Sequence, residues 1–143
     1  MARERCERLM RNSGRGVLAT LHPDRGVDTV PVCFVVDGDR VAVPLDAVKP
    51  KGPSVLQRVR NLEADPRASL LCDHWDPGDW SGLWWVRASL VHTGAGADEQ
   101  GRLGARLAQK YPPYRGQPFT GLLVFGITDL TGWSASPDRT PPG

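Results

Sequence analysis

Cationic side chains gather around one short stretch of the 143-residue sequence, "DAVKPKGPSVLQRVRNL". The cations within it and just beyond it are Lys49, Lys51, Arg58, Arg60 and Arg67. Pro53 follows Gly52, and proline is well tolerated at the first helical position, so the lysines immediately precede a predicted helix. A helix N-terminus binds phosphate through unpaired N–H groups and its dipole, and an arginine one turn later could add a bidentate contact. On spacing alone, a solvated helix face is the favoured interpretation and a phosphate site is the alternative.

Tryptophans form a second group of residues that could bind a ligand. Trp75, Trp80, Trp84 and Trp85 fall within eleven residues. Amphipathic rings at that density often line interfaces or planar ligands. Taken alone, they are better explained by a core and a dimer contact. A phosphate site and an aromatic strand in one small domain would, however, suit a flavin-like cofactor.

Catalysis by side chains alone has little support in the sequence. There is no GxSxG motif, and no histidine has an evident serine or cysteine partner. His22, His74 and His92 are dispersed, so no metal site is expected. Any demanding chemistry would therefore come from a bound cofactor.

The overall composition is that of one globular domain. The chain is 40% hydrophobic and 24% charged, with a net charge of +2, which gives no reason to expect general nucleic-acid binding. It has no apolar run long enough to span a membrane and no secretory signal. Three scattered cysteines, Cys6, Cys33 and Cys72, are typical of a reducing compartment, so we expect a cytoplasmic protein.

The elements that would position these residues are mostly strands. Strands are predicted over 16–22, 30–36, 40–45, 68–75, 83–92 and 121–133, with a hairpin turn at Asp37–Asp39. Helices are predicted over 2–12, from Pro53 to about Leu62, and over 98–111 with Asp98 as the N-cap. Alternation predicts that Trp84, Val86, Ala88 and Leu90 share one face of a strand. This order predicts a mainly β (α+β), largely antiparallel barrel with helices at its ends.

The segment from Lys49 to Ala88, "KPKGPSVLQRVRNLEADPRASLLCDHWDPGDWSGLWWVRA", resembles the pyridoxamine 5'-phosphate oxidase-like, FMN-binding split-barrel superfamily. It is more closely similar to the actinobacterial branch that uses the deazaflavin coenzyme F420. The resemblance covers nearly all of residues 1–134. It implies a six-stranded antiparallel split β-barrel domain over 1–134 with flanking helices, followed by a flexible tail over 135–143. It also implies a homodimer that binds the cofactor in a groove between its subunits.

The same resemblance implies hydride transfer between C5 of F420 and a small organic acceptor, with no catalytic side chain. Lys49 and Lys51 would hold the cofactor phosphate, helped by Arg58 and Asn61. The backbone of Thr29, Val30, Pro31 and Val32 would border the ring system. Trp85 and Arg87 would lie near the groove, from the same sheet or from the partner subunit.

Two departures from the family pattern keep alternatives open. Pro44-Leu45-Asp46-Ala47 stands where the family usually has a Thr-Ala-Val-Asp-like run, so a hydroxyl that would contact phosphate is missing. Ala88-Ser89-Leu90 follows "WVR", where a glycine is usual. The alternatives are an FMN-dependent oxidase or reductase of the same fold and a non-catalytic protein that binds a cofactor or haem. A small barrel that stacks single-stranded nucleic acid on its tryptophans is the least attractive, because the net charge is low.

Overall fold

The computed structural model describes residues 1–46, 53–116 and 119–137. Lys49 and Lys51 therefore lie outside the described residues. The helices are α1 (Arg3–Asn12), α2 (Pro53–Ala64) and α3 (Ala97–Lys110), and two 3₁₀ turns are η1 (Trp80–Gly82) and η2 (Pro112–Tyr114). The strands are β1 (Gly16–His22), β2 (Gly26–Val32), β3 (Val35–Asp37), β4 (Arg40–Asp46), β5 (Arg67–His74), β6 (Trp84–His92) and β7 (Phe119–Ser134).

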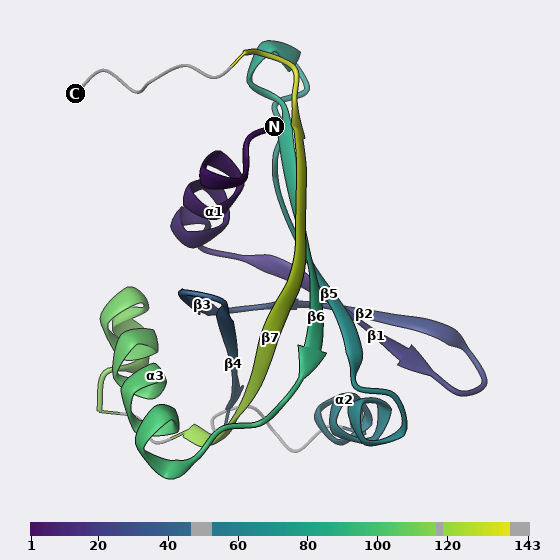
Figure 1. The fold of residues 1–143 in the computed structure, drawn as a ribbon, viewed down its shortest axis with the longest axis vertical. Coiled ribbons are helices and arrows are strands. Elements are labelled where there is room, and N and C mark those ends of the chain that lie inside the picture. Colours follow the sequence, from purple (N-terminus) through teal and green to yellow (C-terminus); the bar gives the residue numbers. More distant parts are fainter. Residues whose placement is uncertain (47–52, 117–118, 138–143) are drawn as a thin grey trace.

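The strands form one antiparallel sheet in the order β2-β1-β5-β6-β7-β4-β3. β2 and β3 occupy opposite edges of this sheet, yet only Cys33 and Phe34 separate them along the chain. The sheet must therefore curl until its two edges meet at this joint. The result is an open barrel in which the β1–β2 hairpin projects away from the long strands β5, β6 and β7 (Figure 1).

The strand count corrects the six-stranded expectation. The apolar run 30–36 was predicted as one strand, but the chain leaves β2 at Val32 and begins β3 at Val35. Phe34 lies between the two strands, completely buried, and it belongs to neither ladder. The remaining strands, and a mainly antiparallel β fold with three helices, agree with the prediction.

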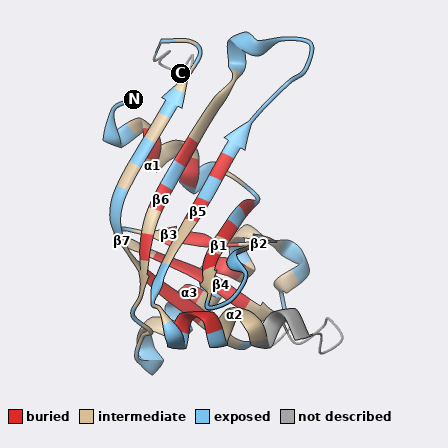
Figure 2. Ribbon diagram, turned by 90° about the vertical axis from the view of Figure 1, so that its right-hand side faces the viewer, coloured by how far each residue is buried: buried red, intermediate tan, exposed pale blue. Residues whose placement is uncertain are grey.

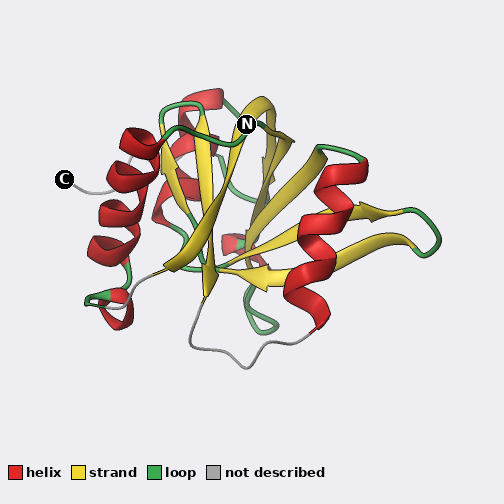
Figure 3. Cartoon of the chain, turned by 90° about the horizontal axis from the view of Figure 1, so that it is seen from below, coloured by secondary structure: helices red, strands yellow, loops and turns green. Residues whose placement is uncertain are grey.

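The inner face of the curled sheet forms the main core. Along β6, Val86, Ala88 and Leu90 are at most 1% exposed, whereas Arg87 is exposed, as the alternation predicts. Leu18, Phe34, Leu70 and Phe125 are fully buried in the same cluster. Figure 2 shows buried segments, in red, along β1, β5 and β6. A smaller cluster lies under α3, made of Val35, Ala42, Leu103, Leu107 and Val124. Figure 3 shows α2 beside the β1–β2 hairpin and α3 on the opposite side of the sheet.

One local prediction needs correction: the N-cap of α3 is Gly96 rather than Asp98. Asp98 lies in the first turn of the helix, where its negative charge interacts favourably with the helix dipole. After β7, the Ala135 amide donates to the Leu83 carbonyl at 2.8 Å, and the Ser136 hydroxyl donates to the Ser81 carbonyl. The flexible tail over 135–143 stays a prediction. No helix within the described ranges is long and apolar enough to cross a bilayer.

Candidate functional site

Asn61 fastens α2 to the β1–β2 hairpin. Its side chain is fully buried, and its Nδ2 donates to Thr20 Oγ1 at 3.0 Å and to Asp28 Oδ2 at 2.9 Å. Its Oδ1 accepts from Gln57 Nε2 at 2.8 Å. Thr20 is itself only 2% exposed. The Asn61 amide therefore forms these hydrogen bonds within the protein, and they fix the position of α2 against β2.

Asp28 receives a second partner from the turn of the hairpin. Arg25 Nη2 lies 2.9 Å from Asp28 Oδ2, and Arg25 Nε lies 3.2 Å from Oδ1. The hydrogen bonds from Arg25 and then from Asn61 lower the pKa of the Asp28 carboxyl, because both stabilise its ionised form. The turn, the edge strand and α2 are thus joined through one carboxylate.

Arg58 is the unusual member of the cation group. Its Nε is buried and has no hydrogen-bond partner among the described residues. Burial lowers the pKa of its guanidinium because desolvation disfavours the charged form. A buried donor without a partner carries a desolvation cost that an anionic ligand would offset. Arg58 lies one turn before Asn61 on α2, so it belongs to the same junction between α2 and the β1–β2 hairpin.

The other cations of the stretch behave differently. Arg60 is exposed. Arg67 lies 2.7 Å from Asp65 in an ion pair. The hydrogen bond from the Arg67 side chain, and then the one from its backbone N–H, lower the pKa of Asp65 to about 2. Arg67 is therefore already paired, and of the described arginines in this group only Arg58 has a donor that is buried without a partner.

The predicted ring-bordering strand is an edge strand. Among the strands of the described residues, β2 pairs only with β1, so one side of its backbone is not used by this sheet. Thr29 and Pro31 are exposed, Val30 is half-buried and Val32 is buried. Proline at an edge is consistent with this position, since it has no N–H to donate to a ladder. Thr29 directly follows Asp28, so the contact between Asn61 and Asp28 brings α2 and β2 together.

Trp85 and Arg87 lie on the outer face of the sheet. The Arg87 guanidinium is 5.3 Å from the centre of the Trp85 ring. The strand register aligns Pro31, Val17, Leu71 and Arg87 in one row across β2, β1, β5 and β6. Three strand spacings separate Arg87 from Pro31, about 14 Å. One protomer therefore does not bring Trp85 and Arg87 to the β2 edge.

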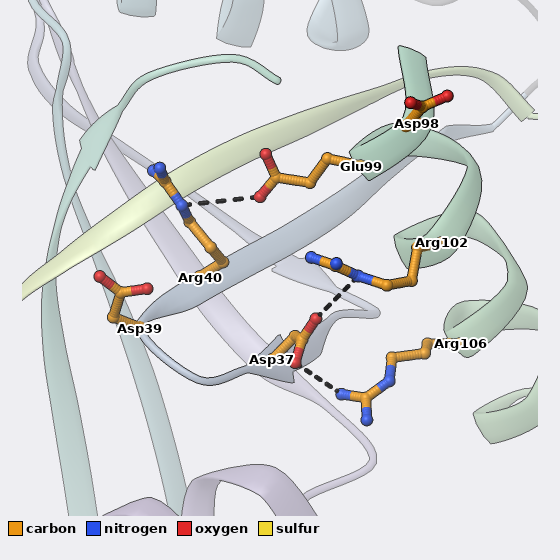
Figure 4. Close-up of a pocket in the computed structure, with 7 residues that line it drawn as sticks. All are labelled: Asp37, Asp39, Arg40, Asp98, Glu99, Arg102 and Arg106. Carbon is orange, nitrogen blue, oxygen red and sulfur yellow. Dashed lines mark ion pairs between the residues drawn. The ribbon is translucent and has the colours of Figure 1, made fainter. Parts of the chain in front are cut away.

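Among the hollows lined by described residues, one lies close to this junction and a larger one lies away from it. One of about 280 Å³, mostly apolar, lies on the outer face beside β2 and is lined by Ala19, Thr20, Leu21, Val27, Arg67, Ala68 and Ser69. A larger open hollow of about 620 Å³ lies between α3 and the β3–β4 hairpin. There Asp37 pairs with Arg102 at 3.2 Å and with Arg106 at 3.1 Å, and Arg40 pairs with Glu99 at 3.6 Å (Figure 4). Those charges satisfy one another, so we do not assign a ligand to the larger hollow.

Thr20, Arg25 and Asp28 complete the α2 junction but were not identified from the sequence. Asp28 lies in the turn-and-strand segment "PDRGVD", where an acid is ordinarily explained by turn chemistry. Thr20 falls in an apolar strand at an inward-facing position. An inward-facing hydroxyl in such a strand is the one local signal that a polar partner lies nearby.

Solved structures share this arrangement of strands. The conserved hypothetical protein Rv2991 from Mycobacterium tuberculosis superposes with a TM-score of 0.75 at 19% identity, covering 100% of this chain and 93% of that one. A FAD-binding protein from Mesorhizobium loti superposes with a TM-score of 0.65 at 15% identity, covering 92% of each chain. The chain has the split-barrel fold of pyridoxamine 5'-phosphate oxidase-like proteins.

A further split barrel with this fold is described as an F420 reductase. It is 20% identical, with a TM-score of 0.58, and the match covers 87% of this chain and 94% of that one. No protein-family model and no curated protein sequence matches the chain. At these identities the comparisons establish the architecture of the split barrel.

Proposed function

We propose that this split barrel is an oxidoreductase that binds coenzyme F420 and passes a hydride between it and a small organic acceptor. The observation that carries the proposal is the buried Nε of Arg58, which has no partner among the described residues. It lies where α2 meets the β1–β2 hairpin, next to the edge strand β2, whose outer backbone pairs with no other strand that the structure describes. An anionic cofactor at this junction would supply the acceptor that Arg58 lacks.

The residues of the chain would divide the work of binding. Arg58 would contact the cofactor phosphate together with Lys49 and Lys51, which precede α2 in the sequence. Asn61 would act indirectly, by holding α2 against Asp28. The β2 backbone from Thr29 to Val32 would border the ring. When bound, F420 supplies the hydride at C5, and the protein supplies orientation and shelter from water.

We further propose that two copies pair through the outer face of the sheet. Val17, Leu71 and Trp133 are 37%, 40% and 48% exposed, although each is a large apolar side chain. Leu71 is directly opposite Val17, and Trp133 is directly opposite Trp85. Covering this face would bury apolar area. It would also bring Trp85 and Arg87 of one protomer toward the β2 edge of its partner, a position they do not reach within one chain.

A cofactor titration tests the proposal. Purified chain is titrated with F420, FMN and haem, and reduced F420 is then offered with a panel of enones, quinones and tetrapyrroles. We expect saturable F420 binding and acceptor-dependent loss of reduced F420. Binding of FMN or haem without F420 binding would overturn the assignment.

The second candidate is a flavin-dependent or haem-binding protein of the same fold. It is favoured by the resemblance to a FAD-binding split barrel, and haem-binding proteins have this fold as well. An anionic phosphate or propionate could meet Arg58 in either case. The same titration separates the candidates, since it compares all three cofactors on one protein.

A further inference from the structure

The joint between β2 and β3 lacks the support that a strand ladder would give. Phe34 is fully buried, so its backbone N–H and C=O both need partners inside the protein. Phe34 belongs to neither strand, and β2 and β3 lie at opposite edges of the sheet and do not pair with each other. No strand ladder therefore supplies these partners. We call this joint at Phe34, where the two edges of the sheet meet, the seam of the barrel. Side chains from outside the sheet must hold it closed.

Tyr111 and Lys110, at the C-terminal end of α3, fill that role. The Phe34 N–H donates to the Tyr111 hydroxyl at 3.1 Å. The same hydroxyl lies 3.1 Å from the Phe34 carbonyl and 3.0 Å from the Gly14 carbonyl, so its single proton has two acceptors. Lys110 Nζ donates to the Phe34 carbonyl at 3.0 Å.

The lysine also contacts the ring of the residue that it holds. Its ammonium lies 4.1 Å from the centre of the Phe34 ring, a cation–π contact that is stronger where water is excluded. Gly14 lies two residues before the start of β1, so the tyrosine hydroxyl joins the entry to β1 and the exit from β2. The two residues therefore fix three parts of the chain at one point: the start of the sheet, its seam and the end of α3.

We propose that Lys110 and Tyr111 are positioning residues for the cofactor site, because they fix the end of β2 through the backbone of Phe34. Val32 and Pro31, which would border the cofactor ring, lie two and three residues before Phe34. If the seam opens, this end of the edge strand loses its anchor. This inference rests on the proposed function, since it takes β2 as the strand that borders the cofactor.

The test uses Tyr111→Phe, which keeps the ring and its edge contact with Tyr114 at 5.7 Å but removes the hydroxyl. Backbone amide exchange over residues 29–34 and the dissociation constant for F420 are measured on the intact protein. We expect exchange at Phe34 to rise about fivefold and F420 binding to weaken about fivefold, as for one lost hydrogen bond. Lys110→Met should have a similar effect, and Lys110→Arg should restore part of the binding because it keeps a donor.

Thr93→Val is the matched control. The Thr93 hydroxyl also has three neighbours, Arg40 Nη1 at 3.0 Å, the Gly94 carbonyl at 2.9 Å and the Val124 carbonyl at 3.4 Å, but it is away from the seam. We expect it to lower the melting temperature without changing exchange at Phe34 or F420 affinity.

Unchanged F420 affinity in Tyr111→Phe would overturn the positioning role, whatever the effect on exchange. If the wild-type chain binds no F420, the proposed function fails by that result, and exchange at Phe34 still decides whether the two residues hold the seam.

Discussion

Asn61 of α2 donates a 2.9 Å hydrogen bond to the carboxylate of Asp28 in β2. This contact links the helix that carries Arg58 to the edge strand next to it, and it does so from a fully buried side chain. The position of Arg58, whose Nε has no partner among the described residues, therefore depends on an amide whose two N–H protons are both donated within the protein.

Asn61→Ala should lower the free energy of unfolding by more than most substitutions of a polar residue do. It removes the donor from the buried Thr20 hydroxyl and from Asp28, and leaving buried groups unsatisfied costs about 2 kcal/mol. Urea unfolding followed by circular dichroism measures the change. Arg60→Ala, at the exposed neighbouring position, is the control and should change the free energy of unfolding by less than about 0.5 kcal/mol. Equal effects of the two substitutions would contradict the structural role of Asn61.

Arg58→Met should separate stability from ligand binding. The thioether chain fills similar space and removes a buried donor that has no described partner, so the cofactor-free protein should gain about 1 kcal/mol. Affinity for F420 should fall about tenfold, as for the loss of a charge-assisted contact. Thermal melts without ligand and fluorescence titration with F420 measure both quantities. Arg60→Met is the matched control, and an equal loss of affinity there would remove the special assignment of Arg58.

Stability should decline in acid partly through Asp28. Its pKa is lowered by Arg25 and Asn61, so the ionised form stabilises the folded chain above the unfolded value of 3.8. That contribution is lost as the pH falls below 3.8 through the lower folded pKa. Asp28→Asn should therefore flatten this part of the pH profile. Urea midpoints of both proteins at about pH 6 and about pH 3 test this expectation, and parallel profiles would argue against it.

Leu71→Glu should give a monomer if the outer face is the dimer contact. A charge in the middle of an apolar interface is costly to bury, so association should weaken by at least about tenfold. Sedimentation velocity measures the oligomeric state, and the F420 titration shows whether the site needs the second copy. Gln109→Glu, at an exposed position on α3, adds the same charge elsewhere and should leave both properties unchanged. A dimer that persists in Leu71→Glu would exclude this face.

Cysteine labelling should report on the core. Cys6 and Cys72 are buried, whereas Cys33 is partly exposed. Burial is the main cause that raises the pKa of the Cys72 thiol to about 11, so little reactive thiolate forms at neutral pH. Iodoacetamide should modify Cys33 first in the native protein and all three cysteines after unfolding, as read by mass spectrometry. Labelling of Cys72 as fast as Cys33 would mean that the core opens readily.

Patterns within single elements predicted most of this fold. The alternation along β6 and the turn Asp37-Gly38-Asp39 are local signals, and the structure has both features; Gly38 adopts the positive φ of 60° that such a turn requires. The break at Phe34 has no such signal. It depends on Tyr111 and Lys110, which are distant along the chain, so an apolar run that looks continuous becomes two strands.

The candidate site was predictable in part for the same reason. The spacing of Arg58 and Asn61 predicts that both lie on one side of α2, and the helix begins at Pro53 as expected. The use of the Asn61 amide by Thr20 and Asp28 is a tertiary effect, set by how the hairpin packs on the helix. The assignments of Lys49 and Lys51 to the phosphate stay predictions, because these residues lie outside the described ranges.

The order of the strands has a consequence for biosynthesis. β7 is synthesised after the other six strands of this sheet, yet it lies between β4 and β6 and pairs with both. Until β7 emerges, β4 is paired only with β3, and β6 is paired only with β5. Each of these two strands then has one unpaired edge. Unpaired edges on a nascent chain invite pairing with other chains, and distant strand pairing slows folding. The barrel can therefore close only after β7, which begins at Phe119, has been translated, and chains truncated before Phe119 should be prone to aggregate.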